Sequence, residues 1–341
     1  MRLEDFNYDL PPELIAQCPT ERRDQSRLLV LDRRTGAMEH RIFHDLVLYL
    51  KPSDILVMND TRVLPARLLG RRSVTGGKVE VLLLKEIAPG QWETLVKPGR
   101  RCPPGETLVF GQGQLTAYIK ERTPEGGRIV AFNVQGPDFL TTLNDIGQIP
   151  LPPYIHAQLT DPERYQTVYA KHLGSAAAPT AGLHFTPELL ARIRALGVET
   201  VFITLNVGLG TFRPVQEEVI EKHHMHQESY YISPETAQLI NTAKKEGRRI
   251  VAVGTTVVRT LESAGETGHV EPGGRSTDLF IYPGFDFKIV DALVTNFHLP
   301  KSSLLMLVAA LAGYDNIMAA YQEAVHQRYR FFSFGDAMLI I

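Results

Sequence analysis

The sequence predicts an α/β protein into which an all-β domain is inserted, and two patterns predict this fold. From about residue 151 onward, segments typical of strands alternate with segments typical of helices, as in a largely parallel α/β sheet. From about residue 67 to 136, short stretches alternate apolar and polar residues between glycine- or proline-bearing turns, as in a small antiparallel barrel or sandwich. We therefore expect a discontinuous α/β domain over residues 1–62 and 149–341, and a β-barrel domain over residues 63–148.

The first elements in chain order are expected to be strands. The segment RLLVLDRRTGAMEHRIF has the form of a β-hairpin, and DILVM reads as a short apolar strand. The inserted domain then contributes further strands at KVEVLLLKEI, WETLVKP, ETLVF, QLTAYIKER and RIVAFNV.

Helix start and stop residues place the elements that follow. Thr186 is suited to cap a helix with Pro187 at its first position, and Gly197 stands where that helix should end. Ser233 and Gly247 repeat the pattern around PETAQLINTAKKE. Further helices are expected at TTVVRTLES, SSLLMLVAALAG and DNIMAAYQEAVHQR, and further strands at VETVFITL, RIVAV, LFIYP, DALVT and AMLII.

The composition excludes several classes of protein. The formal charge of −2 gives no general attraction to nucleic acid. Cys18 and Cys102 are the two cysteines, which argues against a disulfide framework and against cysteine-ligated metal. The N-terminus is acidic and broken by prolines, unlike a signal peptide, and the apolar run from Leu304 is too short to cross a bilayer. We therefore expect a cytoplasmic protein.

Polar residues gather in the loops that follow four predicted strands. These loops read NDTRVLPAR, NVGLGTFRPV, GTTVVR and NFHLPKSS. Because ligands of α/β sheets bind at the carboxyl ends of strands, the four loops together indicate a site at one edge of the sheet. The GxG of NVGLGTF is a weak dinucleotide motif, since its third glycine would fall at Arg213. The helix start at GTT, with Arg259 one turn further on, suits either a bound carboxylate or phosphate or plain threonine capping.

The histidines leave alternatives open. In the run HHMHQE an extended backbone would put His224, His226 and Glu228 on one face, which suits a metal site, a general base or a solvated cluster. Without a firm fourth ligand we expect no metal. His184 and His298 lie in glycine- or proline-bounded loops beside phenylalanines, where a catalytic role competes with a structural one.

Five Arg-Arg pairs are scattered along the chain, at 22–23, 33–34, 71–72, 100–101 and 248–249. Such pairs are usually solvated surface. Pairs that fall on one face would instead form a phosphate-binding surface, and the sequence alone does not bring them together.

Long motifs along the whole chain resemble those of one enzyme family. They are YDLPPELIAQ, RDQSRLLVLDR, NDTRVLPARL, PLPPYI, RYQTVYA, AAAPTAGLHF, VGLGTFRPV, AVGTTVVRTLE, DALVTNFHLPKS and YRFFSFGDAMLI, in this order. With them the chain closely resembles the S-adenosylmethionine:tRNA ribosyltransferase-isomerases of queuosine biosynthesis. The resemblance is weakest in the predicted insertion, where GGKVEVLLL and VKPG are the main anchors. It implies a barrel-like α/β catalytic domain with an inserted β-barrel, which agrees with the patterns above.

The resemblance also implies a reaction. The ribosyl group of S-adenosylmethionine is transferred to the 7-aminomethyl-7-deazaguanine base at the tRNA wobble position and isomerised, which gives epoxyqueuosine-tRNA and releases adenine and methionine. S-adenosylmethionine is then a co-substrate, and neither a true cofactor nor a metal is expected. The expected partners are the modified tRNA and S-adenosylmethionine, with no membrane, and the expected state is a monomer.

The implied chemistry assigns roles to residues in the matching motifs. The sulfonium acidifies the ribose C5′ hydrogens, so the reaction needs a positioned base, and the departing adenine needs a proton or a hydrogen-bond donor. The candidates for catalysis are His184, Asn206, His226, Glu228 and His298. Arg213 and Arg259 are suited to hold a carboxylate or phosphate, and Phe185 or Phe212 to stack on a base. The expected substrate-binding residues are Asn59, Asp60, Thr61, Arg62, Pro179, Thr180, Gly182, Phe185, Gly208, Gly210, Thr211, Phe212, Arg213, Gly254, Thr255, Thr256, Arg259 and Asn296.

One position departs from the family pattern. Where the family usually reads T-L-H-V-G, this chain has Asn206, and asparagine does not accept a proton at neutral pH. If this position supplies the base, the enzyme is slow or uses a neighbouring histidine; if it orients substrate, asparagine serves. The small residues of GSAAAPTAGLHFT, 174–186, are expected to let a ligand lie against the main chain, with His184 and Phe185 facing the pocket.

Two other functions compete with this one. A non-catalytic RNA-binding protein would use the β domain as its binding module and would not need S-adenosylmethionine. An RNA methyltransferase would release S-adenosylhomocysteine, but the sequence lacks the glycine-rich first loop of the usual doubly wound methyltransferase.

Overall fold

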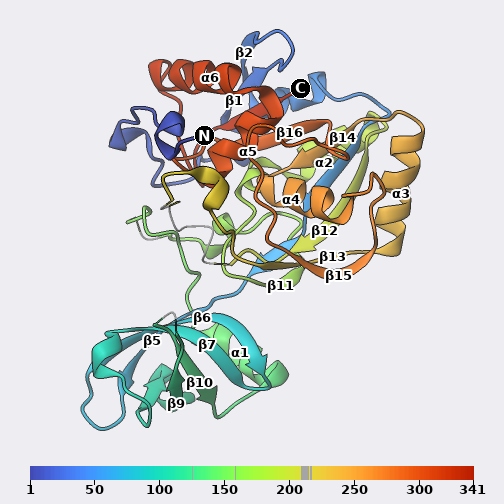
Figure 1. The fold of residues 1–341 in the computed structure, drawn as a ribbon. Coiled ribbons are helices and arrows are strands. Elements are labelled where there is room, and N and C mark those ends of the chain that lie inside the picture. Colours follow the sequence, from blue (N-terminus) through green and yellow to red (C-terminus); the bar gives the residue numbers. More distant parts are fainter. Residues whose placement is uncertain (125, 158, 209–214, 216) are drawn as a thin grey trace. The chain divides into compact units, whose positions relative to one another are not determined.

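The computed structural model describes residues 1–124, 126–157, 159–208, 215 and 217–341. The chain forms two compact units, Met1–Arg62 with Pro153–Ile341, and Val63–Pro152 (Figure 1). The first contains a large mixed sheet with helices, and the second a closed antiparallel β-barrel, so the predicted fold class is confirmed. Four of the expected binding residues, Gly210, Thr211, Phe212 and Arg213, lie outside the described residues.

A nine-stranded sheet forms the centre of the larger unit. Its strand order is β15-β13-β12-β3-β14-β16-β17-β1-β2. The four central strands β12, β3, β14 and β16 run parallel, whereas both flanks contain antiparallel pairs. The sheet is therefore parallel where the candidate loops leave it and mixed elsewhere. Its strands are β1 (Arg27–Leu31), β2 (Met38–Ile42), β3 (Ile55–Asn59), β12 (Glu199–Leu205), β13 (Glu228–Ile232), β14 (Ile250–Val253), β15 (Gly273–Thr277), β16 (Ala292–Asn296) and β17 (Ala337–Ile340).

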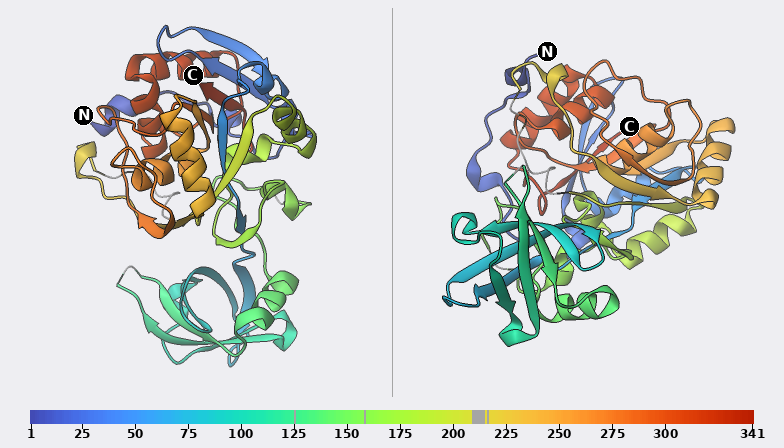
Figure 2. Two further views of the ribbon diagram at one scale, coloured as in Figure 1. Left: turned by 90° about the vertical axis from the view of Figure 1, so that its right-hand side faces the viewer. Right: turned by 60° about the horizontal axis from the view of Figure 1, so that its bottom comes forward.

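Helices pack on both faces of this sheet (Figure 2). The predicted helix starts are confirmed, because the Thr186 hydroxyl accepts a hydrogen bond from the Leu189 N–H and the Ser233 hydroxyl accepts one from the Thr236 N–H, both at 3.1 Å. One face carries α3 (Pro234–Lys245), α4 (Thr255–Ala264), α5 (Ser303–Ala312) and α6 (Tyr314–His326). The other carries α2 (Pro187–Ala195) and two 3₁₀ helices, η4 (Phe43–Leu48) and η8 (Thr180–His184).

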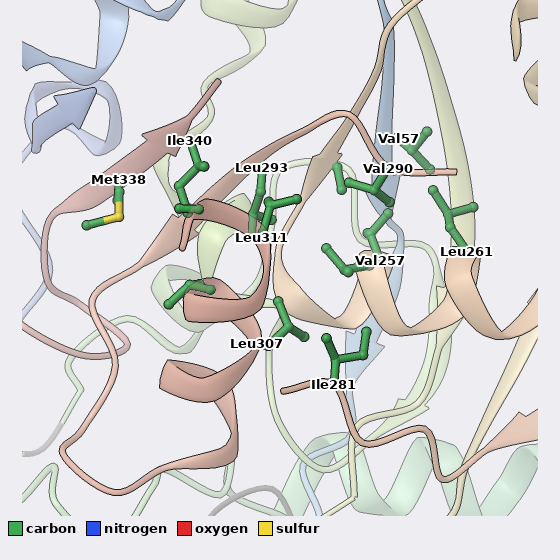
Figure 3. Close-up of a cluster of buried hydrophobic side chains, with 14 of the residues drawn as sticks. Val57, Val257, Leu261, Ile281, Val290, Leu293, Leu307, Leu311, Met338 and Ile340 are labelled. Carbon is green, nitrogen blue, oxygen red and sulfur yellow. The ribbon is translucent and has the colours of Figure 1, made fainter. Parts of the chain in front are cut away.

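Alternate residues of the central strands supply two separate cores. Ile55 and Val57 of β3 face the first core, whereas Leu56 and Met58 face the second, as the two-residue period of a strand requires. Figure 3 shows part of the first core, with the side chains of α4 and α5 against β3, β16 and β17. Burial of each of these aliphatic side chains stabilises the fold by about 1.5–3 kcal/mol. The packed layers therefore hold the strand ends, from which the loops leave, in fixed positions.

The smaller unit is a six-stranded barrel whose order is β10-β7-β6-β5-β8-β9. Inward-facing residues of every strand, together with Phe139 and Leu143 of α1, fill its core. The barrel elements are β5 (Arg67–Arg72), β6 (Lys78–Ala88), β7 (Gln91–Lys97), β8 (Thr107–Phe110), β9 (Leu115–Arg122), β10 (Arg128–Phe132) and α1 (Gly136–Ile146). A further two-stranded sheet pairs β4 (Thr61–Val63) with β11 (His172–Ser175).

One predicted strand is wrong. The segment LFIYP, 279–283, has no strand assignment and follows β15 as irregular chain. Other contacts fix this segment: the Ile281 side chain is buried in the first core, and the backbone carbonyl of Leu279 accepts a hydrogen bond from Arg259 Nε at 3.0 Å.

Among the described residues, no single helix combines the length and the apolar composition needed to cross a membrane. The α5–α6 pair meets that test only jointly, with a bend of 117° between the two helices.

Candidate active site

The loops expected to form a site do leave one edge of the sheet. β12, β3, β14 and β16 are neighbours and parallel, so their carboxyl ends share that edge. Polar side chains at these ends are buried to an unusual degree: Asn59, Thr61 and Asn296 are at most 3% exposed. Buried polar groups need partners. Some of these residues have all their polar atoms bonded to protein groups, whereas others have an atom with no partner among the described residues.

The start of α4 is open to a ligand. Gly254 connects β14 to α4 with φ of +92°, in the left-handed region that favours glycine. Among the described residues no side chain caps this helix start. Thr256 does not act as the cap; its hydroxyl accepts a hydrogen bond from Asn59 Nδ2 at 3.4 Å. The geometry favours the anion-binding alternative over threonine capping, because the N-terminus of a helix attracts negative charge.

Asn59 is occupied by protein groups. Its Oδ1 accepts from the N–H groups of Thr61 and Leu205, at 3.1 and 3.0 Å, and its Nδ2 donates to the Leu205 carbonyl at 3.1 Å. These contacts fasten the end of β3 to the end of β12. Asn59 therefore shapes the site, and direct contact with substrate would cost it these bonds.

A chain of polar contacts surrounds Asn206. The Thr61 hydroxyl donates to Asn206 Oδ1 at 2.9 Å. Next to Thr61, Asp60 accepts a hydrogen bond from the Thr204 hydroxyl at 2.6 Å through one carboxylate oxygen, while His172 Nε2 lies 3.5 Å from the other. The Asp60 carboxylate is 11% exposed and the His172 side chain 53% exposed. A half-exposed imidazole beside a buried carboxylate is an arrangement suited to proton transfer.

Glu228 and Arg259 form a buried ion pair. Arg259 Nη1 donates to Glu228 Oε2, and the two side chains are 5% and 3% exposed. The other Glu228 oxygen accepts a hydrogen bond from the Gly208 N–H at 2.9 Å. Arg259 Nη2 is buried and has no hydrogen-bond partner among the described residues. The pair therefore leaves one guanidinium donor for an anionic ligand group.

His184 is held by protein on both ring nitrogens. Nδ1 lies 2.7 Å from the Ser26 hydroxyl, Asn296 Nδ2 lies 3.2 Å from Nε2, and the ring stacks on Phe43 at 4.9 Å between centroids. Burial lowers the pKa of His184 to about 3, with Arg23 as a further cause. These contacts favour a structural role for His184 as a neutral link between η8 and Asn296. Asn296 Oδ1 is buried without a partner among the described residues.

His298 keeps one nitrogen available. The Thr295 hydroxyl lies 3.0 Å from Nε2, and Nδ1 forms no hydrogen bond with the described residues. The backbone around it is fixed, since its N–H donates to the Tyr321 hydroxyl at 3.0 Å and its carbonyl accepts from the Tyr8 hydroxyl at 2.5 Å. Burial lowers the pKa of His298 to about 3, so the ring is neutral near pH 7.

The segment of small residues before α2, 174–186, packs closely against its neighbours, which its small side chains permit. A Cβ added at Gly182 would lie 2.1 Å from the Tyr169 hydroxyl and 2.8 Å from the Thr167 methyl group. Both hydroxyls, Tyr169 Oη and Thr167 Oγ1, are buried with no partner among the described residues. Phe185, by contrast, is 0% exposed and packs edge-on against Phe43 in the second core. This position favours packing over the stacking role expected for Phe185.

Several expected residues lie at the margin of this site. The side chain of His226 is exposed, and Arg62 is paired with Glu163. A separate small cavity of about 20 Å³ lies beside His184 and is lined by Arg23 and Arg164. Within the described part of the chain, no group of three or more His, Cys, Asp or Glu is arranged to hold a metal ion. Pro179, Gly182 and Thr255 are buried, and Thr180 is half-buried.

Comparison with known proteins decides the family. The profile of the family described as queuosine biosynthesis protein matches residues 3–340. The chain belongs to this family. A family member from Symbiobacterium thermophilum, named S-adenosylmethionine:tRNA ribosyltransferase-isomerase, is 64% identical over 342 residues, and one of the same name from Desulforamulus reducens is 59% identical over 342 residues; both matches cover 100% of each chain. The crystal structure of S-adenosylmethionine tRNA ribosyltransferase from Thermotoga maritima is 44% identical, with a TM-score of 0.58 over 99% of this chain and 100% of that one.

The structure adds residues that the sequence did not single out. His172, Tyr169, Thr167 and Ser26 all contact expected site residues or present unpartnered groups beside them. The family motif RYQTVYA contains two of them, and His172 stands two residues before Gly174. The motif was therefore visible, but a lone tyrosine or threonine in a loop carries no chemical signature by itself.

Proposed function

We propose that this chain is an S-adenosylmethionine:tRNA ribosyltransferase-isomerase. It transfers the ribosyl group of S-adenosylmethionine to the 7-aminomethyl-7-deazaguanine base at the tRNA wobble position and isomerises it, with release of adenine and methionine. The names of relatives that match the whole chain at 59–64% identity support this proposal.

The Nη2 donor of Arg259, which has no hydrogen-bond partner among the described residues, is the structural observation that carries the proposal. It belongs to α4, whose start, one turn away, is not capped by any described side chain. A Cβ on Gly254 would lie 3.7 Å from the Cβ of Ala181, so η8 passes directly over this helix start. A helix N-terminus and a guanidinium suit the carboxylate of the methionyl group. The small side chains of η8 leave its backbone accessible to the rest of the ligand.

The reaction involves three proton transfers. A base removes one proton from C5′, next to the sulfonium, and the sulfur of methionine keeps the electron pair of its broken bond. The attacking aminomethyl group must be neutral and loses one proton as its bond to the ribosyl carbon forms; the departing adenine takes up one proton, and the other passes to solvent. Because the pKa of both His184 and His298 is about 3, neither is a proton donor near pH 7.

His172 is the proton acceptor that fits these requirements. The Asp60 carboxylate lies 3.5 Å from its Nε2, and Thr61, the next residue, links the same strand end to Asn206. Asn206 then orients substrate through its amide, and the half-exposed His172 takes the proton. Arg259 binds the methionyl carboxylate, and Glu228 positions Arg259. S-adenosylmethionine is a co-substrate, and the enzyme works as a cytoplasmic monomer without a cofactor.

A turnover assay tests the proposed function. The protein is incubated with S-adenosylmethionine and tRNA carrying 7-aminomethyl-7-deazaguanine; adenine is followed by chromatography and the tRNA nucleoside by mass. We expect free adenine, free methionine and an epoxyqueuosine nucleoside in equal amounts. S-adenosylhomocysteine in place of adenine would identify a methyltransferase. Binding of tRNA with no turnover and no binding of S-adenosylmethionine would identify a non-catalytic RNA-binding protein.

A further inference from the structure

The β-barrel unit, Val63–Pro152, is basic although the whole chain is not. It carries eleven Lys and Arg against eight Asp and Glu, a formal charge of +3, whereas the rest of the chain carries 25 against 30, a formal charge of −5. Two of the five Arg-Arg pairs, 71–72 and 100–101, belong to this unit. A polyanion is therefore attracted to the barrel in preference to the rest of the chain.

Arg71 and Lys78 stand directly opposite each other on β5 and β6. Both side chains are exposed, and like charges at paired positions destabilise a sheet. Neither forms an ion pair with a described residue. Such a pair lowers the stability of the sheet unless an anion from outside the chain neutralises it.

Three further cations lie at the same end of the barrel. β5, β6 and β7 are antiparallel neighbours, so the end of β5, the start of β6 and the end of β7 meet. Lys97 is the last residue of β7, and Arg100 and Arg101 follow in η5 (Gly99–Arg101). All three are exposed and, like Arg71 and Lys78, have no ion-pair partner in the described part of the chain. These five residues are termed the barrel cationic surface.

The buried side chain of Arg128 fixes the loop that carries Arg100 and Arg101. The Arg128 side chain, 5% exposed, donates from Nη2 to the Gly99 carbonyl at 2.7 Å and from Nε to the Cys102 carbonyl at 3.1 Å. Its Nη1 donates to the Gly127 carbonyl at 2.7 Å. The two exposed arginines therefore project from an ordered backbone, so that binding through them orders little more than the side chains themselves.

Two of the acidic residues nearby are already engaged. Glu80, which is opposite Lys97 in the β6–β7 register, is bound instead by Arg67 at 2.8 Å. Glu106 is bound by Arg72 at 2.7 Å. Within the described part of the chain, the barrel cationic surface therefore has no ion-pair partner, and its three arginines suit the paired oxygens of phosphate groups.

We propose that the barrel cationic surface binds the phosphodiester backbone of the tRNA substrate. This inference rests on the proposed function for the identity of the RNA. It assigns the barrel the task of holding tRNA through its backbone, while the sheet edge of the larger unit carries the chemistry. Contacts of this kind give affinity and position but little sequence information.

Two neutralising variants test the proposal, Arg71→Gln with Lys78→Gln, and Lys97→Gln with Arg100→Gln and Arg101→Gln. Binding of unmodified tRNA is measured across a series of salt concentrations, so that no turnover is needed. We expect each variant to bind tRNA about tenfold more weakly or worse. The slope of log K against the logarithm of the salt concentration should become less steep by roughly 0.7–0.9 for each cation removed. The matched control is Lys85→Gln, an exposed residue further along β6 that lies opposite Glu93.

The readouts separate this inference from the proposed function. Binding of S-adenosylmethionine and the thermal unfolding midpoint should be unchanged in both variants, and KM for tRNA should rise with kcat kept. If the wild type turns over and the variants keep its KM for tRNA and its salt dependence, the barrel cationic surface does not bind tRNA, while the proposed function is upheld. Weakened tRNA binding in a protein without turnover would sustain the surface and overturn the function.

Discussion

Glu228 on β13 and Arg259 on α4 form a buried ion pair that joins the edge of the sheet to the helix above it. Glu228 also accepts the Gly208 N–H, so one carboxylate fixes both the guanidinium and the chain that leaves β12. The free Arg259 Nη2 depends on this arrangement, which makes Glu228 a positioning residue and leaves it poorly placed to be a free base.

Removal of Glu228 should destabilise the protein strongly. Glu228→Ala leaves Arg259 as an unpaired buried charge, and we expect a loss of about 3–5 kcal/mol in the free energy of unfolding, measured by urea denaturation. Arg259→Lys keeps the charge but loses the planar fork; it should raise KM for S-adenosylmethionine with a smaller loss of stability. If Arg259→Lys leaves KM unchanged, the guanidinium does not bind the co-substrate.

Stability should fall as the pH drops below about 6.5, because two histidines are buried in the neutral form. The pKa of His184 and His298 is about 3 in the folded protein and about 6.5 in the unfolded chain. Between these values the unfolded chain binds protons that the folded protein does not, so each histidine lowers stability by up to about 1.4 kcal/mol per pH unit as the pH falls; above pH 6.5 its contribution is constant. Urea denaturation at pH 7.5, 6.5 and 5.5 measures this slope.

The control for that slope is a pair of substitutions. His298→Gln should flatten the dependence between pH 5.5 and 6.5, whereas His156→Gln, at an exposed position, should leave it as in the wild type. Equal slopes for all three proteins would show that His298 is protonated in the folded state.

Much of the fold could be read from the sequence, because local signals and tertiary structure agree. Thr186 and Ser233 cap the helices they were expected to cap, and the alternating segments of the insertion form the closed barrel. The strand expected at LFIYP failed because burial of Ile281 and the bond from Arg259 to the Leu279 carbonyl fix this segment in another conformation. An apolar run shows that a segment is buried, but its backbone partners depend on distant residues.

The candidate site was harder to predict than the fold. The loops leave one edge of the sheet, as the rule for parallel strands predicts, yet the rule does not distinguish a residue that meets a ligand from one that supports it. Asn59 and His184 have their polar atoms occupied by protein groups, which no sequence pattern reveals. His172 reaches Asp60 across more than a hundred residues of chain, and only the folded structure pairs them.

Tyr169→Phe should separate stability from activity. Tyr169 Oη is buried without a partner among the described residues, so its removal should leave the free energy of unfolding unchanged or raise it by about 1 kcal/mol. If a ligand group completes this hydroxyl, the same change should lower kcat/KM for S-adenosylmethionine by about tenfold, the cost of roughly one hydrogen bond. Tyr118→Phe, at an exposed tyrosine on β9, is the control. A destabilised but fully active Tyr169→Phe protein would assign the hydroxyl to the fold alone.

His172 and Asn206 can be tested together, because the contacts through Asp60 and Thr61 place them on one polar chain. His172→Gln removes the proposed proton acceptor but keeps a polar group, and we expect adenine release to fall by about a hundredfold or more, within the range of general base catalysis. Asn206→His restores a titratable ring next to Thr61 and should recover part of the rate in the His172→Gln background, with an acidic limb in the pH profile that reports the new histidine. Unchanged adenine release by His172→Gln would exclude it as the acceptor, and a lack of rescue by Asn206→His would confine position 206 to orientation of the substrate.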